Sequence, residues 1–177
     1  MQSVNKTQME QAAHLFASAF MNDPAFSFCL KNEKDPQSLM YQFFSQYLNN
    51  CKELMLYTTS GDMEGFLCFY RWDKMPTEDF DCPDSLKNLE KFQILEHYYD
   101  RDFAVLDIMA VDPAHRGKGY AGKMIDFFVS YCKKNGLTPL VEIFSADNVD
   151  LYCCRGFEIK HQQTNGEITT FVLEYSL

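Results

Sequence analysis

A basic, glycine-rich turn between an apolar run and an amphipathic segment constrains the fold of this chain more than any other feature. The apolar run covers Phe103–Val111, and the turn Arg116-Gly-Lys-Gly119 leads directly into the amphipathic segment. This order predicts a strand, a loop and the N-terminus of a helix. The first N–H groups of a helix have no intrahelical acceptor and lie at the positive end of the helix dipole, so they bind phosphate groups. We therefore expect an anion site here, with a pyrophosphate as the anion.

Three glycines and two basic residues fit such a site. Gly117, Gly119 and Gly122 allow the backbone to approach a ligand closely, and Arg116 and Lys118 add positive charge. An ordinary tight turn needs fewer glycines, so the glycines favour a ligand site. Lys118 is equally compatible with direct contact to the phosphates and with a solvated cation near them.

Length, charge and cysteine content narrow the class of protein. The 177 residues predict one domain, residues 1–177, with a substantial core. No apolar stretch is long enough to cross a membrane and the first residues carry no signal-peptide pattern, so we expect a cytoplasmic protein with no membrane partner. The net charge of −9 argues against a nucleic-acid partner and modestly favours a cationic acceptor such as an amine, although a charge that serves solubility alone is the more common case. The seven cysteines include the adjacent pair Cys153-Cys154 but no CxxC pair, which predicts reduced thiols and no metal site.

Hydrophobic periodicity and turn residues predict helices and strands along the whole chain. Expected helices cover residues 7–21, 36–48, 85–99, 119–135 and 149–155, and expected strands cover residues 54–58, 64–71, 103–111, 139–144, 157–163 and 167–175. Thr7-Gln-Met-Glu10 has the pattern of a capping box at the start of the first helix, and Asp23-Pro24 ends that helix. The strand–helix–strand unit over residues 103–144 predicts a right-handed parallel crossover, and the other strands favour antiparallel pairing. The fold class is therefore a mixed α/β or α+β sheet with helices on both faces.

Two well-known nucleotide motifs partly match the glycine turn. Gly117–Gly122 satisfies GxGxxG with Glu142 twenty residues further on, as in dinucleotide-binding folds. However, residues 112–116 separate the motif from its strand, and no further alternating strand–helix units follow. A P-loop would need Ser or Thr after Lys123, where this chain has Met124. Nucleotide binding through this turn is therefore the lesser alternative.

A third interpretation of the turn fits the whole second half of the chain. Arg116-x-x-Gly119-x-Ala121 resembles the acetyl-CoA signature of the GNAT family of N-acetyltransferases, which has the form Arg/Gln-x-x-Gly-x-Gly/Ala. Downstream, Asn148, Tyr152 and Gly156-Phe157 resemble a later element of the same family. The expected order of elements also matches, with an extra helix between the third and fourth strands. The resemblance implies an acyl-CoA N-acyltransferase fold, in which a mostly antiparallel mixed sheet contains a central, splayed parallel pair of strands.

The resemblance also implies how the coenzyme is held. The strands 103–111 and 139–144 separate at their C-terminal ends, so that the backbone at the end of the first strand binds the pantetheine arm. The pyrophosphate lies on the N–H groups of the glycine turn. The residues implied to bind acetyl-CoA are Met109, Ala110, Val111, Arg116, Gly117, Lys118, Gly119, Tyr120, Ala121, Gly122, Asn148 and Tyr152.

Amine acetylation requires proton transfers at both reacting ends. An ammonium group must lose a proton before it attacks the thioester, and the leaving thiolate gains one. By the resemblance, Tyr152 is the general acid that protonates the thiolate. Asp107, which alternates in phase with Met109 and Val111 on its expected strand, is a candidate general base. Glu142 and a chain of water molecules are alternative bases, and Asp107 is also compatible with a hydrogen bond to a neighbouring strand or helix.

These observations together predict an acetyl-CoA-dependent N-acetyltransferase with direct attack by a primary amine of a small molecule or peptide. The alternatives are a non-catalytic acyl-CoA-binding sensor or regulatory domain, and a nucleotide-binding protein that uses Gly117–Gly122. The acceptor pocket is expected from the first two helices, residues 72–100 and the last hairpin, where His97 and Tyr98 either line the site or lie on the surface. The many aromatic residues suit either a pocket or a homodimer contact.

Overall fold

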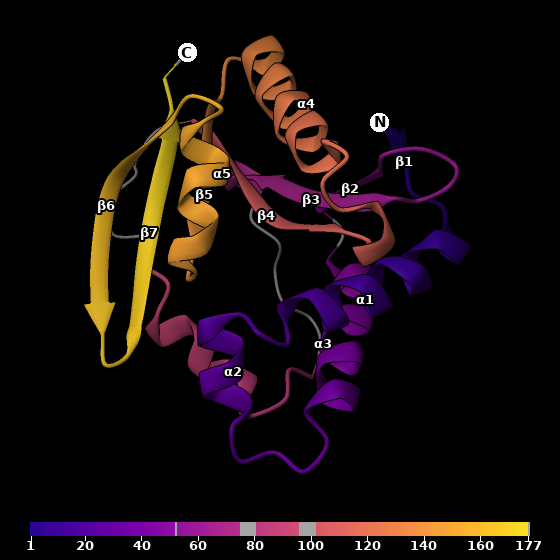
Figure 1. Cartoon of the computed structure of the whole chain (residues 1–177), viewed down its shortest axis with the longest axis vertical. Coiled ribbons are helices and arrows are strands. Elements are labelled where there is room, and N and C mark those ends of the chain that lie inside the picture. The colour runs from indigo at the N-terminus through magenta and orange to yellow at the C-terminus, as the bar shows by residue number, and fades with distance from the viewer. Residues whose placement is uncertain (52, 75–80, 96–101, 177) are drawn as a thin grey trace.

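Seven strands form one mixed sheet in the computed structural model, which describes residues 1–51, 53–74, 81–95 and 102–176. The strands are β1 Gln2–Ser3, β2 Met55–Thr58, β3 Gly65–Arg71, β4 Phe103–Val111, β5 Thr138–Ile143, β6 Phe157–Asn165 and β7 Ile168–Tyr175. They lie in the order β1-β2-β3-β4-β5-β7-β6 (Figure 1). The β4–β5 pair is parallel and the other neighbouring pairs are antiparallel, so the expected mixed sheet with a central parallel pair is confirmed.

Helices cover both faces of the sheet. In the described parts of the chain, the α-helices are α1 Lys6–Phe20, α2 Pro24–Leu30, α3 Pro36–Asn50, α4 Tyr120–Asn135 and α5 Val149–Cys153. The first three lie on one face and α4 and α5 lie on the other (Figure 1). Fully buried rings such as Phe16 and Phe44 fill the core under α1 and α3, and Ile125 and Phe128 fill the core under α4.

The starts of α1 and α2 differ from the sequence-based expectation. The capping box of α1 is Asn5–Gln8 rather than Thr7–Glu10, so this helix begins slightly earlier. Asp23-Pro24 ends α1 as expected, but it also begins α2, which the sequence pattern did not predict. The Asp23 carboxylate accepts the N–H groups of Ala25 and Phe26 at 3.0 and 3.3 Å, and proline fits the first turn because its missing N–H needs no acceptor there.

A helix is expected over residues 85–99, but the described part of this range, residues 85–95, contains a short 3₁₀ helix, η2, at Leu86–Lys91. Residues 92–94 do not continue η2, because the N–H groups of Ile94 and Leu95 donate to the Glu142 carboxylate on β5 rather than to helical carbonyls. The last four residues of the expected helix, with the acceptor-site candidates among them, lie outside the described residues.

The two parallel strands separate after four residue pairs. Phe103–Leu106 pairs with Thr138–Val141, and no pairing between β4 and β5 follows. Beyond that point β4 continues to Val111 along β3, and β5 continues to Ile143 along β7. The expected splay is therefore confirmed. None of the described strands lies beside the end of β4 on the β5 side, where a ligand can take the place of a strand.

A β-bulge at Asp107 interrupts β4 where the strands begin to separate. The register of β3 skips Asp107, which has no opposing residue. Leu106 packs on the α4 face but Ile108 packs on the α1–α3 face, although a regular strand would place both on one face. The bulge therefore shifts the alternation by one residue and turns Asp107 toward α3. The expected phase of Asp107 with Met109 and Val111 is wrong, because those two side chains pack on the α4 side.

Candidate active site

The glycine turn holds the start of α4 in a conformation that presents main-chain N–H groups. Gly117 and Gly119 have φ values of 74° and 81°, in the left-handed region that glycine adopts without strain. Gly119 precedes the first helical residue, and the Lys123 N–H donates to its carbonyl at 3.2 Å. The N–H groups of residues 120–122 precede this first helical hydrogen bond, so they are available to an anion.

A groove of about 630 Å³ runs from the glycine turn to the end of β4. Lys118 lies apart from the groove, since its ammonium group donates to the Ala114 carbonyl at 3.0 Å on the surface. Tyr152 also lies outside this groove and lines a neighbouring cavity. The other residues expected to bind acetyl-CoA all line the groove, namely Met109, Ala110, Val111, Arg116, Gly117, Gly119, Tyr120, Ala121, Gly122 and Asn148.

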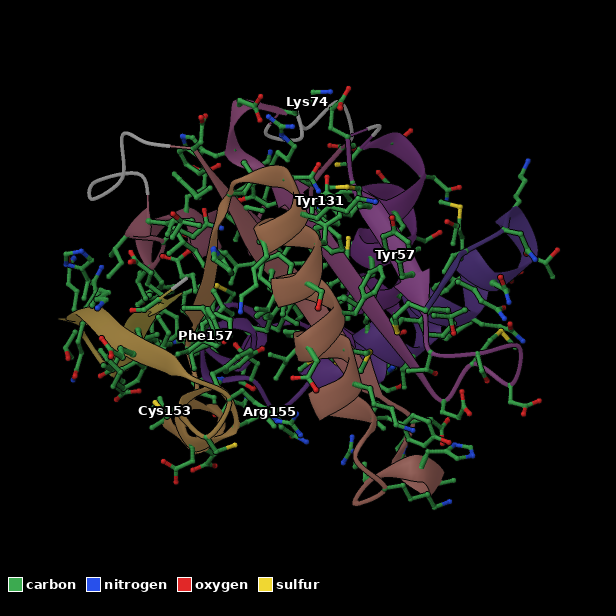
Figure 2. The ribbon with its side chains drawn as sticks, turned by 90° about the horizontal axis from the view of Figure 1, so that it is seen from above. Tyr57, Lys74, Tyr131, Cys153, Arg155 and Phe157 are labelled. Atoms are coloured by element: carbon green, nitrogen blue, oxygen red, sulfur yellow. The ribbon has the colours of Figure 1, made fainter. Side chains whose placement is uncertain are left out.

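Arg155 adds a positive charge to the groove that the sequence analysis did not anticipate. Its guanidinium lies against Gly122 in the first turn of α4 and pairs with Asp126 at 2.8 Å. Figure 2 shows Arg155 near the start of this helix. A Cβ at position 122 would clash with this guanidinium, so the glycine makes room for it. The available signal in the sequence is a basic residue directly before Gly156-Phe157.

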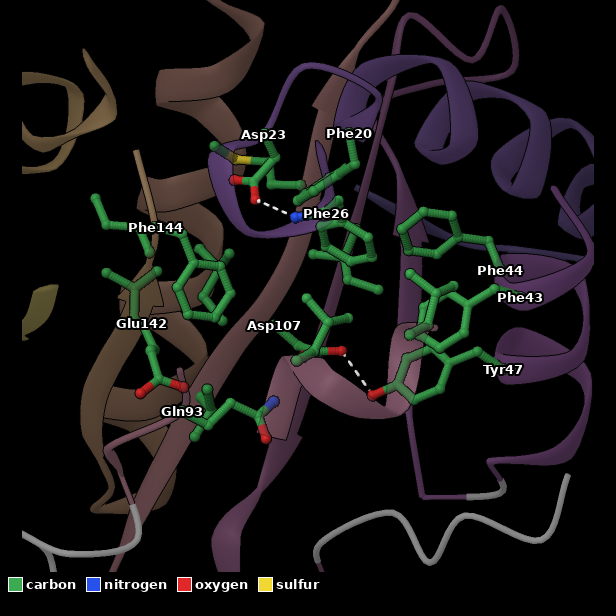
Figure 3. A pocket seen from close by; sticks show the side chains of 18 of the residues that line it. Phe20, Asp23, Phe26, Phe43, Phe44, Tyr47, Gln93, Asp107, Glu142 and Phe144 are labelled. Carbon is green, nitrogen blue, oxygen red and sulfur yellow. Dashed lines mark hydrogen bonds between the residues drawn. The ribbon is translucent and has the colours of Figure 1, made fainter. Parts of the chain in front are cut away.

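A second hollow, of about 240 Å³, opens where β4 and β5 diverge. One wall of this cavity carries Glu142 and Phe144 from the end of β5 and Tyr152 from α5. Figure 3 shows Asp107 between this wall and a wall of aromatic rings. These rings come from α1, α2 and α3 and belong to Phe20, Phe26, Phe43, Phe44 and Tyr47. The cavity therefore combines an apolar surface with carboxylates.

Asp107 is oriented by the α3 helix. The Tyr47 hydroxyl donates a hydrogen bond to its Oδ2 atom at 2.8 Å (Figure 3). Burial and the nearby Asp107 charge raise the pKa of Tyr47 well above the ordinary range, so the phenol stays protonated as a donor. The Asp107 carboxylate is therefore anchored on one side while it contributes to the wall of the cavity.

Glu142 has a tethering contact. Its Oε1 atom accepts the N–H groups of Ile94 and Leu95 at 2.6 and 3.0 Å. These bonds attach the chain after η2 to β5 and thereby close one side of the cavity. Of the two carboxylates that the sequence offers as a general base, Glu142 thus supports the backbone, whereas Asp107 accepts a hydrogen bond from a side chain.

Tyr152 provides a buried phenol in the cavity wall. The residue is 5% exposed, and its ring packs edge-on against Phe157 with ring centroids 5.7 Å apart. Burial raises the pKa of the Tyr152 phenol well above the ordinary range, so the hydroxyl carries its proton at neutral pH. A proton donor therefore lies in the cavity wall, adjacent in sequence to Leu151, which lines both the cavity and the groove.

The groove and the cavity meet at the end of β4. Five described residues line both hollows, namely Phe20, Asp23, Met109, Asn148 and Leu151. A ligand whose phosphates lie on the glycine turn can therefore reach a second ligand in the cavity. Asp23 and Asn148 are the polar members of this junction, and burial raises the pKa of Asp23 from 3.8 to about 6.

The seven cysteines are free thiols, as expected. Over the described residues, no group of three or more His, Cys, Asp or Glu side chains is placed to hold a metal ion. No described helix combines the length and apolar character that a membrane span requires.

Residues 19–157 match the model of the acetyltransferase (GNAT) family. A histone acetyltransferase HPA2 and related acetyltransferase from Corynebacterium glutamicum has a similar structure, with a TM-score of 0.72 and 14% identity over 97% of this chain and 92% of that one. A yellow fever mosquito protein assigned as arylalkylamine N-acetyltransferase 7 gives a TM-score of 0.69 and 12% identity over 97% and 84% of the two chains. A chain of the NatC complex bound to Gag peptide and CoA gives a TM-score of 0.54 and 15% identity over 99% and 96%. No curated protein sequence matches this chain.

Proposed function

The chain belongs to the acetyltransferase (GNAT) family, and from this premise we propose that it is an acetyl-CoA-dependent N-acetyltransferase that acetylates a primary amine directly. The observation that carries the proposal is the junction of groove and cavity at the end of β4. Direct transfer requires both substrates to be bound together, with the reacting atoms brought to about 3–3.5 Å. Two contiguous hollows of different chemical character meet this requirement.

The groove suits acetyl-CoA in shape and charge. The left-handed glycines and the N–H groups of residues 120–122 fit a diphosphate, and Arg116 and Arg155 supply positive charge. The main chain of Met109–Val111 pairs with no described strand on its β5 side, so it can bind an amide-bearing arm as an added strand. When bound, the coenzyme supplies the acetyl thioester.

We further propose that the acceptor is a small primary amine with an aromatic or branched apolar body. Aromatic rings suit the apolar body, and the Asp107 carboxylate suits an ammonium group. The overall charge of −9 favours the approach of a cation. The mosquito neighbour assigned to arylalkylamines supports this class by analogy. A cavity of about 240 Å³ favours a small molecule over a peptide.

The chain's own residues supply the proposed proton-transfer and charge-stabilising groups. Asp107, anchored by Tyr47, contacts the ammonium group of the acceptor and is a candidate to deprotonate it. In the proposed reaction, a main-chain N–H near Val111 stabilises the oxygen that becomes negative during attack. Tyr152 gives its phenolic proton to the departing sulfur, a role for which burial keeps it protonated.

Two alternative functions, an acyl-CoA sensor and a dinucleotide-binding protein, would require different structural features. An acyl-CoA sensor would use the groove, but it would have no need for a polar cavity continuous with it. A dinucleotide-binding protein would place an acidic residue near the ribose, whereas Glu142 lies in the cavity and tethers Ile94 and Leu95. The β4–β5 pair is moreover the only parallel pair among the described strands.

Ligand-dependent melting and a thiol-release assay test the proposal together. CoA and acetyl-CoA should raise the melting temperature, and ATP and NAD should not. Free thiol should then appear when acetyl-CoA is mixed with an arylalkylamine such as phenethylamine. Stabilisation by CoA without thiol release from arylalkylamines, alkylamines or peptides would contradict an enzyme and support a sensor. Stabilisation by ATP alone would contradict coenzyme binding.

A further inference from the structure

We propose that Asp23, which lies at the junction of the groove and the cavity, accepts the proton that the acceptor's ammonium group must lose before attack. This inference rests on the proposed acetyltransferase function and assigns its general base. Of the residues that line both hollows, Phe20, Met109, Asn148 and Leu151 have no titratable side chain, so Asp23 is the one that can exchange a proton where the two substrates meet.

The Asp23 carboxylate is fixed in place with one oxygen available. Its Oδ1 atom accepts both capping hydrogen bonds, from the N–H groups of Ala25 and Phe26. Figure 3 shows the bond from Phe26. Its Oδ2 atom accepts no hydrogen bond within the described part of the chain. The two amides thus orient the group without using the second oxygen, which is the arrangement that a positioned base requires.

Burial gives this carboxylate a proton affinity suited to the task. Although the two amide hydrogen bonds favour the charged form, burial outweighs them and raises the pKa of Asp23 to about 6. A base with a pKa close to the working pH is ionised often enough to act and still binds the proton firmly. Asp107, in contrast, accepts a hydrogen bond from Tyr47 and is better placed to hold the ammonium group than to take its proton.

The proton balance of the reaction assigns one proton to each of two side chains. A primary ammonium has three N–H bonds and the amide product has one, so two protons leave the nitrogen. The first passes to Oδ2 of Asp23 and then to solvent, which gives the nitrogen its lone pair. The nitrogen then forms the C–N bond as the C–S bond breaks. The sulfur takes the proton of Tyr152, and the second nitrogen proton restores that phenol.

The variant Asp23→Asn isolates proton transfer from structure. Asparagine caps helices as well as aspartate does, so its side-chain oxygen can keep both amide hydrogen bonds of α2. The two acceptors compared are phenethylamine, or whichever arylalkylamine the thiol-release panel identifies, and its β,β-difluoro analogue. Fluorine lowers the ammonium pKa of the analogue toward neutrality, so this amine arrives largely deprotonated and needs little help from a base.

At pH 7 the variant should lose on the order of 10²–10⁴-fold in kcat/KM with the parent amine. With the difluoro analogue it should lose less than about tenfold, and its affinity for CoA should be unchanged. Raising the pH should restore activity with the parent amine, because the amine then deprotonates in solution. An equal loss with both amines, or no loss with either, would overturn the assignment.

A pH profile provides the second readout. The wild-type kcat/KM should fall as the pH drops through about 6, because Asp23 becomes protonated. Titratable and charged groups that face the same hollows include Lys87 and Glu90 of η2, Asp107 of β4 and His115 beyond it. Cys29 of α2 lies outside both hollows, but the Asp23 charge contributes to the raised pKa of its thiol. Histidines ordinarily titrate in this range, so His115→Gln is the control and should keep the acid limb.

A failed assignment is distinguishable from a failed function. If the acid limb persists in Asp23→Asn or disappears in His115→Gln, Asp23 is not the base, although the enzyme remains an acetyltransferase. If the wild-type protein binds CoA but turns over no amine of the panel, both the proposed function and the role of Asp23 are wrong.

Discussion

The coenzyme groove and the acceptor cavity share five residues, but they are built from different parts of the chain. The groove takes its polar groups mainly from the main chain of one continuous segment, from the end of β4 to the first turn of α4. The cavity takes its polar groups from side chains at the N-cap of α2 and on α3, η2, β4, β5 and α5, which are distant in sequence. Main-chain groups recognise any ligand of the right shape, whereas side chains distinguish one acceptor from another.

Because of this difference, the groove and the cavity have separate roles in the proposed reaction. The groove can hold a common coenzyme with little dependence on side-chain identity, as long as Gly117 and Gly119 keep their backbone conformation. The cavity sets the acceptor and supplies the proton-transfer groups. Changes in one region should therefore leave the other region's binding intact, and variants of each region test this separation.

The largest effect is expected from the cavity residue Tyr152. Tyr152→Phe removes the proton donor but keeps the ring against Phe157, so turnover should fall by on the order of 10²–10⁴-fold. CoA affinity, measured by calorimetry, should stay within about twofold of the wild type. A large loss of CoA affinity would place this phenol in the groove and break the separation.

Replacement of the junction residue Asp23 by Asn should stabilise the protein at pH 7, although it lowers the activity. The Asp23 carboxyl binds its proton more tightly in the folded than in the unfolded state. It therefore contributes stability below about pH 4, and this contribution is lost as the pH rises through about 6. Asp23→Asn keeps the cap, so we expect it to raise the free energy of unfolding at pH 7 by about 1–3 kcal/mol. Urea denaturation should show this gain at pH 7 and none below pH 4. A variant less stable than the wild type at pH 7 would contradict the burial of a charged Asp23.

The groove should respond to a change in backbone conformation. Gly119→Ala places a side chain at a φ of 81°, where no atom lies within 4 Å of the new Cβ, so the cost is conformational strain alone. That strain amounts to about 1–2 kcal/mol. We expect roughly tenfold weaker CoA binding and an unchanged KM for the amine. Unaltered CoA affinity would show that the turn does not hold the phosphates.

A matched change in the cavity should have the complementary result. Tyr47→Phe removes the hydrogen bond to Asp107 and keeps the aromatic ring. A hydrogen bond to a charged group contributes about 1.5–3 kcal/mol, and water in the cavity would replace part of it. We expect a rise of about 3- to 10-fold in the KM of the amine, with CoA affinity unchanged. A normal amine KM would remove Asp107 from the acceptor site.

The smallest effects should come from the basic side chains near the phosphates. Arg155→Ala removes a guanidinium from the groove wall, and Lys118→Ala removes an ammonium group that bonds the Ala114 carbonyl outside it. Calorimetry should show CoA affinity reduced by about 3- to 5-fold in the first variant and by less than twofold in the second, since exposed charge pairs contribute about 0.2–1 kcal/mol. The reverse order would move the phosphates toward Lys118.

The groove was predictable from the sequence because it is local. Gly117, Gly119 and the start of α4 follow one another along the chain, so spacing alone indicates their arrangement. Arg155 was not predictable in this way because it reaches the groove from the turn between α5 and β6. The separation of β4 from β5 came from the family resemblance rather than from the residues themselves.

The cavity was less predictable because it depends on tertiary contacts. The pair Asp23-Pro24 predicts the end of α1. That the same pair also begins α2 is evident only from the capping contacts in the structure. The bulge at Asp107 depends on the register of β3 against β4, which hydrophobic alternation does not reveal. The chain after η2 bonds to Glu142 on a strand nearly fifty residues away, and this contact prevails over helical periodicity.

A crystal structure of the protein with CoA tests the central claim most directly. The diphosphate should lie on the N–H groups of the turn Gly117–Gly122, and the sulfur should lie at the junction near Met109, on the path to Tyr152. A diphosphate bound elsewhere, or a sulfur directed away from the cavity, would contradict the account.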